Sequence, residues 1–212
     1  MLSNDNFNFI NDLTERYPAL SSCAPSVNRA VAAILDCYSA GGKLLLCGNG
    51  GSAADCEHIA GEMLKGFMMK REPDQHELMG LALALGSEEQ AAKLQRGVSA
   101  IPLPSISATL SAFANDVDPE LVFAQLVFAL SRRGDILICL STSGNSKNVL
   151  AAAKVANSLG VKTIALTGKN GGELKNICDV CICVPAEETY KVQEYHLPVY
   201  HAICAEVERI LF

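Results

Sequence analysis

The chain has 212 residues, half of them hydrophobic, and its formal net charge is −6 at pH 7. That length suffices for one well-packed core and is short for two enzymatic domains, so we expect a single domain over residues 1–212. The acidic balance argues against a nucleic-acid partner, and the lack of a signal segment or a membrane-length apolar stretch predicts a cytoplasmic protein with no membrane partner.

Helical patterns come first in chain order, at residues 4–17 and 26–40, and make residues 1–41 an N-terminal helical segment. Short apolar strands then alternate with helices, which predicts the α/β class. We expect a three-layer αβα sandwich with a five-stranded parallel sheet, right-handed crossovers and a long C-terminal helix. The expected strands are residues 43–47, 99–103, 135–140, 162–167 and 179–184, and the expected helices are 52–65, 105–114, 119–132, 146–158, 171–177 and 188–211.

Residues 66–98 interrupt this alternation. A mixture of basic and acidic residues gives way to L-A-L-A-L and then to E-E-Q-A-A-K-L-Q-R. The connection is far longer than a usual loop between a helix and a strand, and such loops are commonly functional or mobile. We therefore predict an irregular insertion at residues 66–98.

A hydroxyl-rich turn follows the strand at residues 135–140 and leads into a helix near Asn145. Free backbone N–H groups at a helix N-terminus, together with hydroxyl donors, stabilise a phosphate dianion. A simple helix cap is the alternative explanation for any single one of these residues. Four hydroxyls in six residues at the carboxyl end of a strand favour a phosphate site. They belong to Ser141, Thr142, Ser143 and Ser146.

A second turn of this kind, G-N-G-G-S, follows the strand at residues 43–47. Its glycines allow positive φ angles and a close approach of the backbone to a ligand. Ser52 is placed either to cap the following helix or to touch the ligand. The turn is not a dinucleotide fingerprint, because the G-x-G-x-x-G spacing is missing.

His58 and Glu62 lie four residues apart on the helix after this turn and therefore share one face. Such a pair can chelate a divalent metal or divide acid and base roles. Taken singly, a helix-surface histidine and a solvated carboxylate are the commoner interpretations. Gln193 and His201 recur among apolar residues of the C-terminal helix, whereas Asp55, His76 and His196 are predicted to be structural or surface groups.

The nine cysteines predict reduced thiols in a reducing compartment. Most of them stand beside apolar residues, as small buried hydrophobes do. Cys178, Cys181 and Cys183 are interpreted as part of a buried strand rather than as a zinc site, because no second cysteine pair completes the set of ligands.

From about residue 20 to its C-terminus the chain resembles the sugar isomerase (SIS) domain family, and within it the phosphoheptose isomerases, which act on sedoheptulose 7-phosphate. The resemblance rests on five motifs in order: C-G-N-G-G-S-A-A-D-C-E-H-I-A-G-E, A-N-D, S-T-S-G-N-S, T-G-K-N-G-G and V-Q-E-Y-H-L-P-V-Y-H. It implies a single flavodoxin-like SIS domain. The chain departs from the pattern at Tyr190, where many members have Asp, and in the insertion.

The resemblance also implies a site and a reaction. The reaction is aldose–ketose isomerisation through an enediol, in which Glu62 and His201 move protons between C1 and C2 while the phosphate is anchored remotely. One Zn²⁺ per subunit is implied, held by His58, Glu62, Gln193 and His201. The implied substrate contacts are Asn49, Gly50, Gly51, Ser52, Glu62, Asn115, Asp116, Ser141, Thr142, Ser143, Ser146 and Gln193.

A homotetramer is implied as well. Gln193 and His201 are eight residues apart, about 12 Å of rise along a straight helix, so one metal is not readily reached by both. Either the helix breaks near Pro198 or a neighbouring subunit contributes to the site.

Two other functions stay open at this stage. They are a non-enzymatic SIS protein, such as a phosphosugar-sensing regulator or the replication-initiator-associating relative, and an isomerase of another sugar phosphate.

Overall fold

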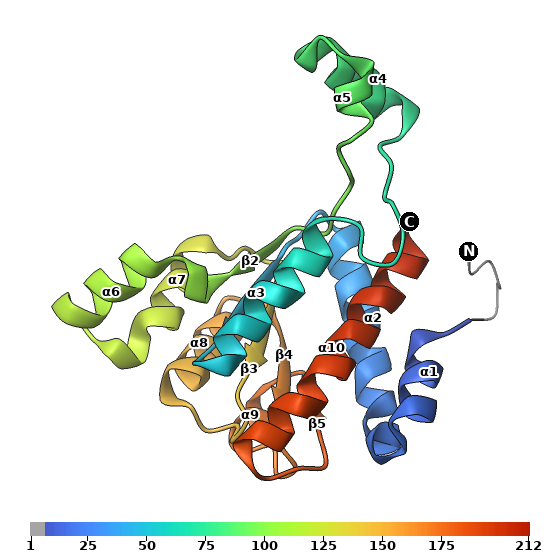
Figure 1. Ribbon diagram of the computed structural model, residues 1–212. Coiled ribbons are helices and arrows are strands. Elements are labelled where there is room, and N and C mark those ends of the chain that lie inside the picture. The colour runs from blue at the N-terminus through green and yellow to red at the C-terminus, as the bar shows by residue number, and fades with distance from the viewer. Residues whose placement is uncertain (1–6) are drawn as a thin grey trace.

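A five-stranded parallel sheet lies at the centre of the structure, a computed structural model that describes residues 7–212 (Figure 1). The strands stand in the order β2-β1-β3-β4-β5, and every neighbouring pair is parallel. This is the strand order of flavodoxin-like folds, so the predicted fold class is confirmed. The strands are β1 Leu44–Gly48, β2 Ala100–Pro102, β3 Ile136–Leu140, β4 Lys162–Thr167 and β5 Val180–Cys183.

Successive side chains of the buried strands pack on opposite faces of the sheet. Leu44 and Leu46 of β1 belong to one apolar core, and Leu45 and Cys47 belong to another. The first core is covered by α1 Phe9–Arg16, η1 Pro18–Cys23, α2 Ala24–Ser39, α3 Gly51–Leu64 and α10 Thr189–Leu211. The second is covered by η2 Leu103–Ser105, α6 Ser107–Asp116, α7 Val122–Leu130, α8 Lys147–Ser158 and α9 Leu174–Ile177, and η3 Pro119–Leu121 lies between α6 and α7 in the chain.

Most predicted boundaries agree with the structure within a few residues, and the exceptions have local causes. The helix α1 begins at Phe9 because the side chain of Asn8 accepts hydrogen bonds from the N–H groups of Ile10 and Asn11. Part of the predicted 4–17 helix lies outside the described residues. The predicted 171–177 helix shortens to α9 because Gly171 and Gly172 have positive φ angles of 76° and 56°.

The prediction of an irregular insertion is wrong, because residues 66–98 contain two helices. These are α4 Gln75–Leu85 and α5 Glu88–Ala91, which pack on each other and form an arm that projects from the body (Figure 1). Asp74 and Glu77 form a reciprocal capping box at the start of α4. No residue of α4 is buried, and the apolar residues of Gln75–Leu85 are not confined to one face of the helix.

Within residues 7–212, every helix is too short or too polar to cross a membrane.

Candidate functional site

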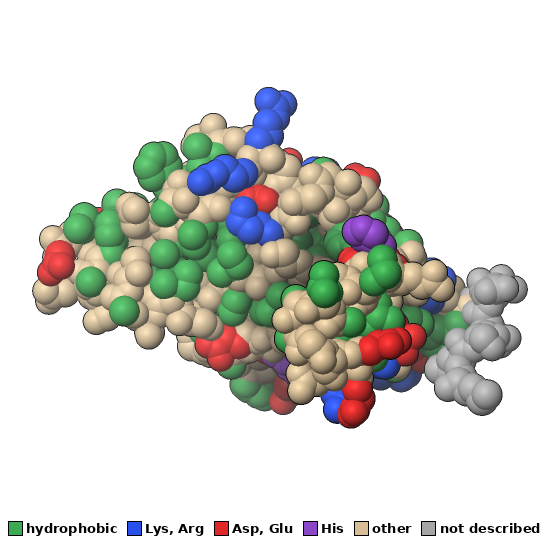
Figure 2. Space-filling view, turned by 90° about the horizontal axis from the view of Figure 1, so that it is seen from above, with side chains coloured by type: hydrophobic (Ala, Val, Ile, Leu, Met, Phe, Trp, Pro, Cys, Tyr) green, Lys and Arg blue, Asp and Glu red, His purple; other side chains and the backbone are tan. Residues whose placement is uncertain are grey.

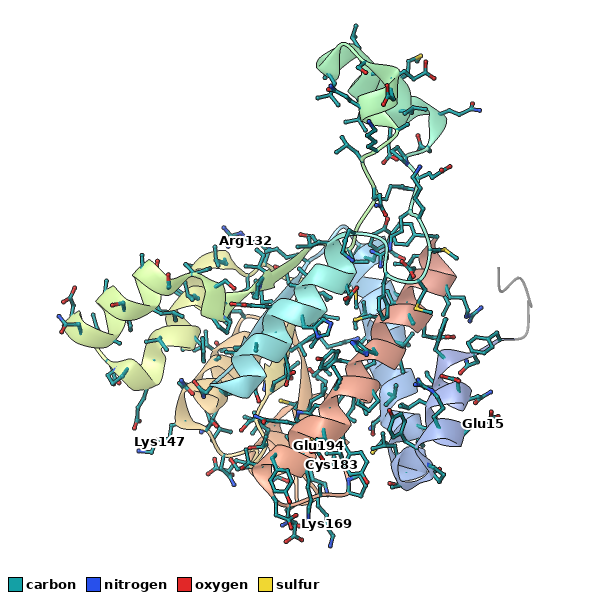
Figure 3. All side chains as sticks on the ribbon, in the orientation of Figure 1. Glu15, Arg132, Lys147, Lys169, Cys183 and Glu194 are labelled. Carbon is teal, nitrogen blue, oxygen red and sulfur yellow. The ribbon has the colours of Figure 1, made fainter. Side chains whose placement is uncertain are left out.

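The two predicted turns lie next to each other at the carboxyl ends of the parallel strands. In Figure 3, Lys147 and Lys169, which come after β3 and β4, lie in the lower part of the body, and Arg132, which precedes β3, lies in its upper part. β1 and β3 are neighbours, and the side chain of Asn49, in the turn after β1, exchanges two hydrogen bonds of 2.9 Å with that of Asn148 in the first turn of α8. Ligands of open α/β sheets bind at these carboxyl ends.

The hydroxyl-rich turn leaves the start of α8 open to an anion. The hydroxyl of Ser146 lies 3.0 Å from that of Ser141 and makes no capping bond to its own helix. The side chain of Ser146 therefore does not cap the helix. Ser143 Oγ accepts a 3.1 Å bond from the N–H of Asn145, and the carbonyl of Thr142 accepts one from the turn after β4. Unpaired N–H groups at a helix start and nearby hydroxyls are the donors that a phosphate requires.

The glycine-rich turn brings bare backbone to the same end of the sheet. Gly50 has a φ of 56° and precedes α3 without a side-chain cap, while Ser52 is buried. A Cβ atom placed on Gly51 would lie 2.6 Å from Nε2 of Gln193, so a larger residue there would displace this flexible side chain. Gln193 therefore packs on the glycine-rich turn. Tyr190, one helical turn earlier, is exposed.

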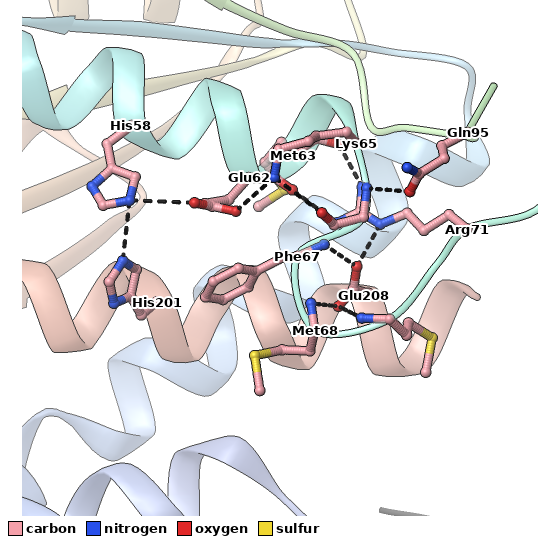
Figure 4. A network of polar contacts seen from close by, with 12 residues as sticks. His58, Glu62, Met63, Lys65, Phe67, Met68, Arg71, Gln95, His201 and Glu208 are labelled. Carbon is pink, nitrogen blue, oxygen red and sulfur yellow. Dashed lines mark hydrogen bonds and ion pairs between the residues drawn. The ribbon is translucent and has the colours of Figure 1, made fainter. Parts of the chain in front are cut away.

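The side chains of His58, Glu62 and His201 meet between α3 and α10 (Figure 4). Nε2 of His58 lies 3.3 Å from Oε1 of Glu62 and 3.4 Å from Nε2 of His201. The Glu62 side chain is 16% exposed, and its other oxygen lies 3.4 Å from Nζ of Lys65. Burial and the neighbouring His58 lower the pKa of His201, against the opposing charge of Glu62. The site thus holds a carboxylate beside an imidazole that favours its neutral form, a pair suited to moving protons.

Behind His58 stand two groups that motif reasoning did not place in the site. The hydroxyl of Tyr200 lies 3.0 Å from Nδ1 of His58 and 3.2 Å from Oδ1 of Asp55. Burial raises the pKa of Asp55, although Tyr200 and His58 oppose that shift. Burial and the charge of Asp55 raise the pKa of Tyr200, so its phenol stays protonated. The available signal was the three-residue spacing of Asp55 and His58, which puts both on one side of α3.

A buried ion pair fixes the end of α3 beside this site. The Glu208 carboxylate accepts bonds from three consecutive backbone N–H groups, those of Phe67, Met68 and Met69, and from Nε of Arg71 (Figure 4). Arg71 in turn donates to the carbonyl oxygens of residues 62 and 63 at 2.8 and 2.6 Å. The root of the arm is thereby tied to α10 and to the backbone of Glu62.

The structure does not bring every predicted site residue together. Asn115 and Asp116 are exposed at the end of α6, where their side chains bond to each other at 2.8 Å rather than to the turns. Gln193 lies at Gly51, seven residues before His58 on α3, which is about 10 Å of helix rise. The helix α10 runs through Pro198 without a break, so the broken-helix explanation is wrong.

The other ionisable candidates stand apart from the site. His76 is exposed on the arm, as predicted for a surface group. His196 is buried, neither of its ring nitrogens has a hydrogen-bond partner among residues 7–212, and burial lowers the pKa of His196 to about 4. In residues 7–212, no three His, Cys, Asp or Glu side chains are arranged to hold a metal ion, and Cys178, Cys181 and Cys183 are no exception.

Comparisons with known proteins place this geometry in a family. Two SIS domain family models match residues 8–101 and 106–206. The chain is 35% identical to a phosphoheptose isomerase of Akkermansia muciniphila, over 97% of this chain and 96% of that protein. It is 39% identical to one of Thiobacillus denitrificans, over 91% and 87% of the two chains. A solved phosphoheptose isomerase from Neisseria gonorrhoeae superposes with a TM-score of 0.74 at 32% identity, over 95% of each chain.

Proposed function

This chain belongs to the SIS domain family, within its phosphoheptose isomerases, and we propose that it interconverts sedoheptulose 7-phosphate and D-glycero-D-manno-heptose 7-phosphate through an enediol. The observation that carries this proposal is the course of α3. The helix begins at the glycine-rich turn and carries Glu62 between His58 and Lys65 at its other end. One end of a sugar phosphate is thereby anchored while the other end meets a base.

The turns and the proton-transfer groups divide the work. Ser141, Ser143 and Ser146 with the start of α8 hold the non-reacting phosphate, and that binding energy positions the reacting carbons. Glu62 removes the proton from the carbon beside the carbonyl and returns it to the neighbouring carbon. His201, which favours its neutral form, accepts and returns the proton of the adjacent oxygen. About 10 Å of α3 separate Gly51 from His58, a span suited to a long open-chain sugar.

We also propose that a zinc ion binds to His58, Glu62 and His201. Imidazole nitrogen and carboxylate oxygen are zinc donors, and two ligand atoms about 2.1 Å from a tetrahedral ion are about 3.4 Å apart. The separations of 3.3 and 3.4 Å around Nε2 of His58 fit that value, but the three side chains are not preformed as a set of metal ligands within residues 7–212, so binding would require them to move. When bound, the ion would stabilise negative charge on the enediolate oxygens as a Lewis acid. Gln193 is left out of this set because it packs on Gly51.

The substrate is tested by incubating the purified protein with sedoheptulose 7-phosphate and following aldose phosphate formation. Conversion at a rate that depends on protein concentration supports the proposal. Conversion of a pentose or hexose phosphate alone would assign the same chemistry to another substrate. Binding of phosphosugars without conversion of any would instead indicate a regulator.

Phosphate anchoring should depend on the hydroxyl-rich turn. We expect Ser143→Ala and Ser146→Ala each to weaken phosphosugar binding, since a hydrogen bond to a charged group is worth about 1.5–3 kcal/mol. Titration calorimetry measures the loss, and Ser158→Ala, at the exposed far end of the same helix, is the control. Unchanged affinity in both site variants would reject the turn as the phosphate site.

We further propose a homotetramer in which the arm packs on another copy of the chain. The side chains of Met79 and Leu83 on α4 are 71% and 87% exposed. Figure 2 looks down on the arm and shows hydrophobic side chains there and along the part formed by α6 and α7. Apolar patches of this kind mark association surfaces.

A cytoplasmic location is part of the proposal and is supported by nine free thiols.

Light scattering tests the assembly. We expect the wild-type mass to be four times 22.5 kDa and the mass of Met79→Ser/Leu83→Ser to be lower. The double variant should keep its fold, because both side chains are exposed within one chain. Leu159→Ser, at the end of α8, serves as the control. A wild-type mass of one chain contradicts the homotetramer, and a tetrameric double variant contradicts the role of the arm.

A further inference from the structure

Tyr200 stands between the half-buried carboxylate of Asp55 and the imidazole of His58. Its side chain is 2% exposed, and its hydroxyl contacts Oδ1 of Asp55 at 3.2 Å and Nδ1 of His58 at 3.0 Å. Asp55 Oδ2 is buried and has no partner in the described part of the chain, so the phenol makes the one side-chain hydrogen bond recorded for this carboxylate.

The two contacts fix the direction of the hydrogen bonds. A phenol carries one proton, and a carboxylate can only accept. Tyr200 therefore donates to Asp55, and its oxygen accepts from the N–H at Nδ1 of His58. In that tautomer Nε2 of His58 carries a lone pair, and this atom faces Glu62 and His201.

Glu62 favours the opposite tautomer. Its Oε1 lies 3.3 Å from Nε2 of His58 and would accept a proton carried there. The tautomer of a neutral imidazole follows the hydrogen bonds that its two nitrogens make. Which ring nitrogen of His58 carries the proton thus depends on the balance between Glu62 on one side and the Tyr200–Asp55 pair on the other.

We propose that Tyr200, supported by Asp55, is a positioning residue that holds His58 with its proton on Nδ1 and its Nε2 lone pair directed into the site. Tyr200 acts through His58 and has no place among the groups that touch substrate. Hydrogen-bond partners of this kind orient and tune the histidine that they contact. The effect on turnover rests on the proposed isomerase function, whereas the tautomer is measured without substrate.

The test is ¹⁵N NMR of the four histidine rings in the full chain, with EDTA present so that no bound metal fixes a tautomer. In wild type we expect His58 to be protonated at Nδ1. In Tyr200→Phe the proton should move to Nε2, toward Glu62. We expect kcat to fall about 10- to 100-fold with KM little changed, the range found when such partners are removed. Tyr195→Phe is the matched control, because Tyr195 lies on the same helix and its hydroxyl has no hydrogen-bond partner within residues 7–212; it should change neither the tautomer nor kcat.

A second variant separates positioning from stability. Tyr200→Phe leaves the half-buried Asp55 carboxylate without its partner, so the protein is expected to unfold at a lower urea concentration. Tyr200→Phe/Asp55→Ala removes that unpaired charge and should recover stability, but neither the tautomer nor kcat. If His58 keeps its proton on Nδ1 in both variants, the proposal is overturned. A changed tautomer without activity in wild type would overturn the proposed function and leave the positioning role intact.

Discussion

Replacing Glu62 with Gln is expected to lower turnover by about a hundredfold or more while substrate binding is largely kept. Gln preserves the shape of the side chain and most of its hydrogen bonding, but it cannot take up a proton from carbon. Glu62 is the carboxylate in the cluster that it forms with His58 and His201, so no second carboxylate of that cluster can replace it as the base. Steady-state kinetics and exchange of the substrate C2 hydrogen with solvent deuterium measure the effect.

The control for this change is Glu57→Gln on the same helix. Glu57 is exposed and bonds to Ser105 at 2.8 Å, away from the histidines, so its variant should turn over substrate as wild type does. Exchange of the C2 hydrogen at the wild-type rate in Glu62→Gln would show that another group is the base.

The fold could be predicted because its signals are local and repeated. The apolar runs of β1 and β3 read as strands buried on both faces, and all their residues are buried in the structure. The arm was missed for the opposite reason. Helix α4 buries none of its side chains against its own chain, and a helix without a core-facing stripe gives no periodic signal.

The site residues likewise divide into those that a short stretch of sequence predicts and those that it does not. The two turns and the His58–Glu62 pair follow from short stretches of sequence, because a strand end or a helix face already determines which side chains are neighbours. The meeting of His58 with His201 spans 143 positions, and that of Tyr200 with Asp55 spans 145. No local pattern predicts such contacts, so the resemblance to a family suggested His201 and nothing suggested Tyr200. The buried role of Glu208 likewise depends on where α10 packs.

Removal of the charge of Glu208 is expected to be the most destabilising single change described for this chain. Both Glu208 and Arg71 have side chains that are 1% exposed, and their 2.7 Å contact joins α10 to the segment that leaves α3. Glu208→Gln leaves the Arg71 guanidinium buried without its counter-charge. Breaking one side of a buried pair costs about 3–5 kcal/mol. Urea unfolding measures the change in the free energy of unfolding, with Glu89→Gln in the exposed pair with Lys93 as the control.

A double variant shows what else the carboxylate holds. Replacing both members of a buried pair with apolar residues is often neutral, because no unpaired charge is left. Here Arg71→Met/Glu208→Leu should remain destabilised, since three backbone N–H groups at residues 67–69 also lose their acceptor. Each such group left unsatisfied costs about 1–3 kcal/mol. A double variant as stable as wild type would mean that these N–H groups find other partners, and that Glu208 serves Arg71 alone. Loss of stability in both variants, together with lower turnover under conditions where each stays folded, would show that the pair also holds the backbone of Glu62 in place.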